Sequence, residues 1–114
     1  MYKFDVKDAT EKCIAWIQKF FEENGPTCNA VLGISGGKDS SVVAALCVQA
    51  LGKDRVFGVL MPNGEQKDIS DAIHLVKHLG IDYITVNIHY AVLAIKHEVK
   101  PALHDHWSAQ TSIN

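Results

Sequence analysis

Several features that would point to particular protein classes are missing from this sequence. Its three cysteines, Cys13, Cys28 and Cys47, are odd in number and far apart, which argues against a disulfide framework and for a reducing cytosol. No apolar run approaches the roughly 20 residues of a membrane-spanning helix, and the first residues lack the apolar core of a secretory peptide. The net charge of −2 offers no basic surface for nucleic acid. We therefore expect a cytoplasmic protein that binds neither membrane nor nucleic acid, with each cysteine acting as a small buried apolar side chain.

A glycine-rich segment, Ser35 to Ser41 (S-G-G-K-D-S-S), follows an apolar run over 30–34 and precedes a helical apolar pattern over 42–51. Adjacent glycines let backbone N–H groups approach phosphate oxygens, and the start of a helix adds partial positive charge. The Ser35 and Ser40 hydroxyls can donate further hydrogen bonds. The Asp39 carboxylate fits beside a phosphate if a divalent cation lies between them. The segment predicts a phosphate site, the alternative being a tight turn capped by Ser or Asp without a ligand.

Two common phosphate-binding motifs do not fit this segment. In a Walker A loop, Asp39 would occupy the Ser/Thr position and Leu32 the first glycine. In the dinucleotide fingerprint, Ser35 stands where the second glycine is needed. A different phosphate-binding family is therefore indicated.

The S-G-G-x-D-S string resembles the pyrophosphatase loop (PP-loop) of the N-type ATP pyrophosphatases, and within that superfamily the chain most resembles NAD synthetase of the ammonia-dependent type. The loop alone would be shared with GMP synthetase and tRNA-thiolating enzymes. The Met61-Pro62 segment leading to Gln66 and Asp68 favours NAD synthetase. Further segments similar to that family are Trp16-Ile17-Gln18, Glu23-Asn24-Gly25, Gly58 to Pro62, Asp71-Ala72, Leu79 to Ile81 and Thr85 to Ile88.

The apolar periodicity predicts an α/β fold in which strands and helices alternate. We expect helices over 7–24, 40–51, 68–79 and 91–103, and strands over 30–34, 55–61 and 81–88. Asn24-Gly25-Pro26 is expected to end the first helix through a left-handed cap. Short connections indicate a doubly wound parallel sheet with the strands in the order 3-2-1, and the resemblance implies a Rossmann-like, adenine nucleotide alpha hydrolase-like fold. Ligands bind at the carboxyl ends of such strands, where the loop over 35–41 lies.

The fold is predicted to be incomplete. The first strand of such a sheet is normally central, yet only three strands fit in the 114 residues, which leaves a long apolar edge. By resemblance, residues 111–114 begin a family segment whose continuation is absent, and the lost part carries later strands, a second acidic metal ligand, basic residues near the phosphates and much of a homodimer interface. We expect residues 1–114 to form a single ATP-binding domain lacking its C-terminal half.

The resemblance implies a two-step activity for the full enzyme. The carboxylate of nicotinic acid adenine dinucleotide (deamido-NAD) attacks the α-phosphorus of ATP, pyrophosphate leaves, and ammonia displaces AMP from the acyl adenylate to give NAD. Because Met1 lies close to the first helix and leaves no room for an amidase domain, free ammonia is the expected donor, with a separate glutaminase subunit still open. The alternatives are a non-catalytic ATP-binding module and another adenylating PP-loop enzyme acting on GMP precursors or tRNA.

The expected ATP-binding residues come from the loop and from the resemblance. Catalysis by positioning and charge stabilisation needs no acid–base pair, so no catalytic residue is assigned. Lys38 contacts a phosphate or is a solvated surface lysine, and Leu60 and Met61 contact adenine or pack in the core. By resemblance Gln66 contacts the nucleotide, the alternative being a polar loop side chain. The six histidines, His74 and His78 among them, form no convincing metal set. The full ATP set is Gly33, Ile34, Ser35, Gly36, Gly37, Lys38, Asp39, Ser40, Ser41, Leu60, Met61 and Gln66, with Asp39 also the candidate Mg²⁺ ligand.

Overall fold

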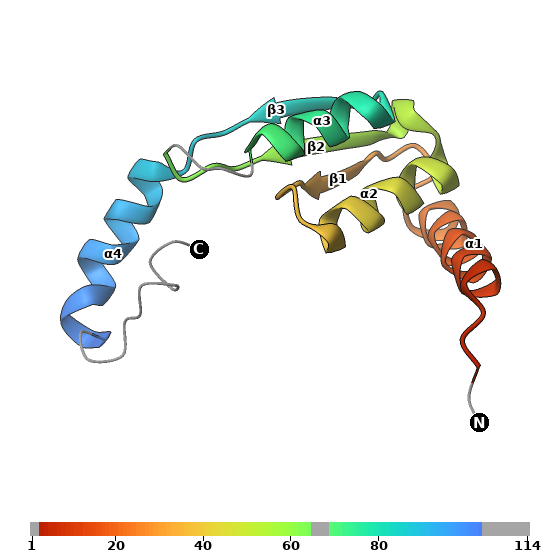
Figure 1. Ribbon diagram of the computed structural model, residues 1–114, viewed down its shortest axis with the longest axis horizontal. Coiled ribbons are helices and arrows are strands. Elements are labelled where there is room, and N and C mark those ends of the chain that lie inside the picture. Colours follow the sequence, from red (N-terminus) through yellow and green to blue (C-terminus); the bar gives the residue numbers. More distant parts are fainter. Residues whose placement is uncertain (1–2, 65–68, 104–114) are drawn as a thin grey trace.

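The computed structural model describes residues 3–64 and 69–103, which form an open, three-stranded parallel sheet with helices along it (Figure 1). The central strand pairs in parallel with both neighbours, in the order β1-β2-β3. This confirms the predicted fold class and strand order. The elements in chain order are α1 (Val6–Asn24), β1 (Ala30–Gly33), α2 (Lys38–Leu51), the 3-10 turn η1 (Lys53–Arg55), β2 (Val56–Leu60), α3 (Ile69–Leu79), β3 (Asp82–Thr85) and α4 (His89–Leu103).

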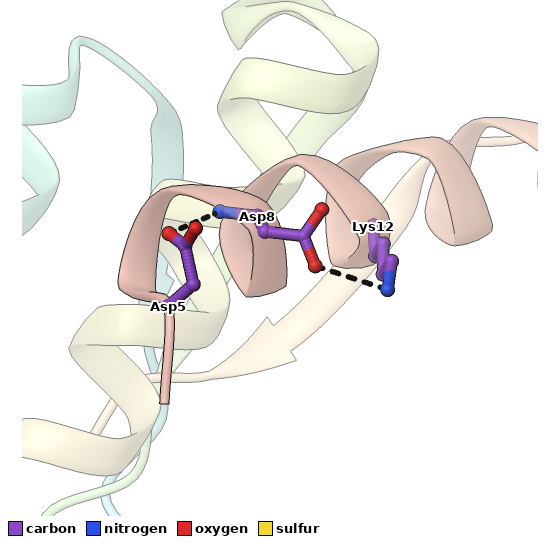
Figure 2. Close-up of polar contacts among 3 residues, drawn as sticks. All are labelled: Asp5, Asp8 and Lys12. Carbon is purple, nitrogen blue, oxygen red and sulfur yellow. Dashed lines mark hydrogen bonds and ion pairs between the residues drawn. The ribbon is translucent and has the colours of Figure 1, made fainter. Parts of the chain in front are cut away.

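Local side-chain contacts determine where α1 begins. The Asp5 carboxylate accepts a hydrogen bond from the Asp8 N–H at 3.1 Å, and the Asp8 carboxylate pairs with Lys12 Nζ at 3.0 Å (Figure 2). An N-cap of this kind contributes about 1 kcal/mol to helix stability. The exposed ion pair adds only about 0.3–0.5 kcal/mol. The start of α1 is therefore encoded within its own first turn.

The end of α1 differs from the sequence prediction. Gly25 donates its N–H to the Phe21 carbonyl at 2.8 Å, but its φ of −175° is extended rather than left-handed. Pro26 follows, and the residue before a proline is pushed by steric contact towards extended conformations. The expected left-handed cap is therefore wrong, and the proline accounts for it.

One face of the sheet is covered by α2 and α3. Alternate residues of β2 are buried on that face, and the predicted apolar side of α3 packs there, as expected. At Gly58 a Cβ would lie 3.2 Å from Ile34 Cγ1 and 3.3 Å from Val76 Cγ1, so a larger residue would require these side chains to shift by a few tenths of an ångström. The buried core consists of Ala30, Ile34, Ala44, Cys47, Val56, Leu60, Ala72, Val76 and Ile81.

The opposite face of the sheet stays open in the part of the chain that the structure describes. Its apolar side chains include Val31, which is 65% exposed, and Ile84, which is 49% exposed. The apolar sequence over 30–34 predicts a strand that is covered on both faces. Within residues 3–64 and 69–103, helices cover only one of these two faces. Within those same ranges, no helix has the length and apolar content that crossing a membrane requires.

The cysteines are less buried than expected. Cys47 lies in the core, and its burial raises the pKa of the thiol. Cys13 and Cys28 are exposed, so the prediction of three buried cysteines is wrong for two of them. Cys13 is on the side of α1 that faces an open groove, where a small apolar side chain has little to pack against.

Candidate functional site

The phosphate-binding candidate is the turn that connects β1 to α2. Gly36 has φ of +89°, a left-handed conformation that favours glycine. The Gly37 carbonyl accepts the Ser41 N–H at 3.2 Å and the Ser41 hydroxyl at 2.6 Å, so α2 begins at Lys38 instead of the predicted Ser40. No side chain caps this helix start. The first-turn N–H groups are therefore left for an anion, which the capped-turn alternative would not provide.

Two serine hydroxyls hold the turn together from the inside. Ser40 Oγ accepts the Ser35 N–H at 3.2 Å and lies 3.1 Å from Ser35 Oγ. Ser35 Oγ in turn accepts the Gly37 N–H at 3.2 Å. These contacts gather two hydroxyls and two backbone N–H groups at the carboxyl end of β1. The hydroxyls can rotate to donate to a phosphate oxygen.

Asp39 provides a carboxylate at the edge of this turn. It is exposed in the first turn of α2, where negative charge is stabilised by the helix dipole, and among the described residues it makes none of the recorded ion pairs. Mg²⁺ usually binds through one or two carboxylates together with substrate phosphates and water. Asp39 therefore suits a magnesium ion shared with a nucleotide.

A metal site made of protein ligands alone is not found in the described part of the chain. Within residues 3–64 and 69–103, no group of three or more His, Cys, Asp or Glu side chains is placed to hold a metal ion. His74 and His78 are exposed on α3, as expected for solvated histidines. A metal at Asp39 would thus need further ligands that the side chains of residues 3–64 and 69–103 do not supply.

The ends of β1 and β2 form the wall next to the phosphate turn. Met61 is 50% exposed, and its Cε packs so close to Gly33 that a Cβ there would be 3.3 Å away. Leu60 is fully buried and Ile34 is 3% exposed, so both side chains pack in the core and only their backbone borders the turn. Core packing is thus the role that the structure gives Leu60. Gln66 lies outside the described residues.

A polar cluster at the ends of β2 and β3 was missed by sequence reasoning. Asn87 Oδ1 accepts the N–H groups of Gly64 at 3.1 Å and His89 at 2.9 Å, and His89 Nδ1 lies 3.3 Å from Asn63 Oδ1. The Asn63-Gly64 pair is a turn signal, and Asn87 stands just before a helix. Neither signal indicates that the two segments meet.

An apolar groove of about 480 Å³ lies elsewhere, between α1, β1 and α2. None of the phosphate-turn residues 35–41 lines it, so it is separate from the candidate nucleotide site. The exposed Trp16 stacks on Phe20 along its wall, with ring centroids 5.3 Å apart. The groove opens beside β1, which is an edge strand of the sheet as described.

Comparisons with known proteins agree with this arrangement. The NH(3)-dependent NAD(+) synthetase of Pyrococcus furiosus is 42% identical over 93 residues, which are 82% of this chain and 36% of that protein. The solved NH3-dependent NAD synthetase of Campylobacter jejuni, in complex with nitrate, superposes with a TM-score of 0.76 at 34% identity over 84% of this chain and 42% of its own. The glutamine-dependent NAD+ synthetase of Acinetobacter baumannii, in complex with ADP, gives a TM-score of 0.77 at 26% identity over 90% of this chain and 20% of its own.

The chain thus spans about a third of the length of the Pyrococcus furiosus relative, which fits the expected fragment. The fold of these neighbours is the Rossmann-like PP-loop fold that the family resemblance implies. The sequence profile of the NAD synthase family matches residues 9–111, nearly the whole chain. With the phosphate turn at the carboxyl end of β1, this match means that the chain belongs to the NAD synthetase family.

Proposed function

We propose that this chain is the ATP-binding part of an enzyme that converts deamido-NAD to NAD. The observation that carries the proposal is the family match over residues 9–111 combined with the uncapped, glycine-containing turn after β1. Ammonia is the proposed nitrogen donor because the Pyrococcus furiosus relative is named for it. Deamido-NAD, ATP and ammonia are the proposed substrates.

The proposed reaction has two steps. The deamido-NAD carboxylate attacks the α-phosphorus of ATP, the bond to the bridging oxygen breaks, and pyrophosphate leaves with that electron pair. Ammonia then attacks the acyl carbon, AMP leaves, and a proton is released as the amide forms. Both steps develop negative charge on phosphate oxygens, so the protein contributes mainly fixed donors and positioning.

The phosphate turn is the proposed holder of the β,γ-phosphates. Ser35, Gly36, Gly37 and Ser40 supply hydroxyl and backbone donors, and Ser41 stabilises the helix start through its bond to the Gly37 carbonyl. Lys38 is the proposed further phosphate contact. Gly33, the Ile34 backbone and Met61 are the proposed pocket wall, and Gln66 is a further proposed nucleotide contact.

Magnesium is the proposed metal, held by Asp39 together with phosphate oxygens. When bound, the ion neutralises charge on the pyrophosphate that leaves.

We also propose a homodimer in the cytoplasm. Three unpaired cysteines support the compartment, and the exposed apolar side of α4, which extends away from the sheet in Figure 1 and includes Tyr90 at 82% exposure, supports an assembly.

The direct test is product formation by the native protein. With ATP, Mg²⁺, ammonium and deamido-NAD, we expect NAD, AMP and pyrophosphate in equal amounts, measured by ion-exchange chromatography. Omitting deamido-NAD should abolish AMP release. ATP binding without AMP release under all conditions would favour the non-catalytic module, and AMP release that depends on xanthosine monophosphate or tRNA would favour another PP-loop enzyme.

We further propose that residues 1–114 are an incomplete domain whose groove beside β1 is covered by another part of the native protein. An exposed apolar groove next to an unpaired sheet edge is unusual in a finished domain. The groove is lined by Cys13 and Val31 among other apolar side chains. Such cover would pair the free edge of β1 and bury Trp16.

Cysteine labelling distinguishes an open groove from a covered one. In the isolated 114-residue chain we expect iodoacetamide to modify Cys13 and Cys28 at similar rates, because both are exposed. In the native protein we expect Cys13 to be protected while Cys28, which does not line the groove, still reacts. Peptide mapping by mass spectrometry gives both rates. Equal labelling of the two cysteines in the native protein would contradict the proposal, and its intact mass would tell whether the cover belongs to the same polypeptide.

A further inference from the structure

Backbone hydrogen bonds between the ends of β2 and β3 continue beyond the strands themselves. Val86 donates to the Leu60 carbonyl at 2.7 Å, and Ile88 donates to the Pro62 carbonyl at 2.9 Å. In a parallel ladder the bonds alternate in direction, so two N–H groups on the β2 side should donate back. Pro62 has no N–H to donate, which removes the first of these bonds. The second would run from Gly64 to the Ile88 carbonyl.

That second bond is not among the recorded backbone bonds, because the chain enters α4 at this point. The Ile88 carbonyl accepts the Val92 N–H at 2.9 Å and begins the helix. The Gly64 N–H turns instead to Asn87 Oδ1 at 3.1 Å, and the same oxygen accepts the His89 N–H at 2.9 Å. One side-chain oxygen thus replaces a missing ladder bond and joins the turn after β2 to the start of α4.

A second contact shapes the same turn. Gly64 has φ of +72°, in the left-handed region, and a Cβ there would lie 3.7 Å from His89 Nδ1. His89 Nδ1 is 3.3 Å from Asn63 Oδ1. The turn over 62–64 is therefore fixed from β3 and α4, and not from β2 alone.

The turn follows directly after Met61, whose Cε lies against Gly33 next to the phosphate turn. We propose that Asn87 is a positioning residue that holds Met61 and the turn over 62–64 in place beside the phosphate turn. Its link to ATP rests on the proposed function, whereas its bond to Gly64 does not.

Two substitutions in the native protein separate the acceptor from the rest of the side chain. Asn87→Ala removes the oxygen, and Asn87→Asp keeps an acceptor at the same position. In Asn87→Ala we expect the Gly64 amide to exchange about fivefold faster and ATP to bind about fivefold more weakly, as loss of one hydrogen bond implies. Asn87→Asp should restore both values. Glycine-selective NMR measures the exchange, and calorimetric titration with Mg-ATP measures the affinity.

The matched control is Asn24→Ala, which removes an exposed hydrogen bond from Asn24 Nδ2 to the Phe20 carbonyl, recorded at 2.9 Å, on α1. It should change neither readout. Any of three results would overturn the proposal. These are unchanged exchange of the Gly64 amide in Asn87→Ala, unchanged ATP affinity despite faster exchange, and an Asn87→Asp variant that binds ATP as weakly as Asn87→Ala. If the alanine variant does not fold, an unprotected Gly64 amide in the unmodified protein would still overturn it. Absence of NAD formation would count against the enzyme and not against this role.

Discussion

Asp39→Ala in the native protein is expected to lower the rate of NAD formation by about 100-fold or more, the scale associated with losing one charge-stabilising group in an active site. Asp39 is exposed at the start of α2, beside the hydroxyls of the phosphate turn. Without its carboxylate, magnesium would lose the protein ligand that the described residues offer at this position. The rate should be measured over a range of Mg²⁺ concentrations, where the variant should need more metal for half-maximal activity.

Asp8→Ala is the control for that experiment. Asp8 is also an acidic residue in the first turn of an exposed helix, but it pairs with Lys12 on α1 (Figure 2). Its loss should cost a few tenths of a kcal/mol of stability and leave the rate unchanged. Asp39 would be no metal ligand if its alanine variant kept normal activity and an unchanged requirement for Mg²⁺. It would then be only a helix N-terminal carboxylate.

Leu60→Ala is expected to lower the free energy of unfolding by about 3 kcal/mol, within the range of about 2–5 kcal/mol found for buried leucines. Leu60 is 0% exposed, and its side chain packs in the core that also holds Val76. Because small domains are stable by only about 5–15 kcal/mol, this loss should be plain in urea denaturation of the native protein.

Met61→Ala makes a matched comparison, because Met61 is the next residue and is 50% exposed. We expect it to change stability by less than about 1 kcal/mol while weakening ATP binding, since its side chain borders the phosphate turn at Gly33. Stability loss that is equal in the two variants would contradict the assignment of Leu60 to the core and Met61 to the pocket wall. Normal ATP affinity in Met61→Ala would remove Met61 from the proposed pocket.

Much of the fold follows from local patterns in the chain. The apolar spacing over 69–79 predicts the buried side of α3, and the alternation of apolar runs with helical patterns predicts three parallel strands in the observed order. The glycines, hydroxyls and carboxylate over 35–41 indicate a phosphate turn, and Gly36 does adopt a left-handed conformation there. Helical periodicity, strand alternation and turn chemistry all act within a few residues, which is why they can be read from sequence.

Other features needed the three-dimensional arrangement. Leu60 and Met61 are both apolar and adjacent. Because side chains alternate between the two faces of a strand, Leu60 at the end of β2 lies in the core and Met61 just after it lies towards the phosphate turn. Cys13 has the spacing of a core residue but faces an open groove. Asn87 meets Gly64 across 23 positions of sequence because β2 and β3 run side by side as far as the start of α4, where the Gly64 N–H pairs with the Asn87 side chain. Contacts between distant segments depend on how strands are registered side by side, and no short stretch of sequence records that register.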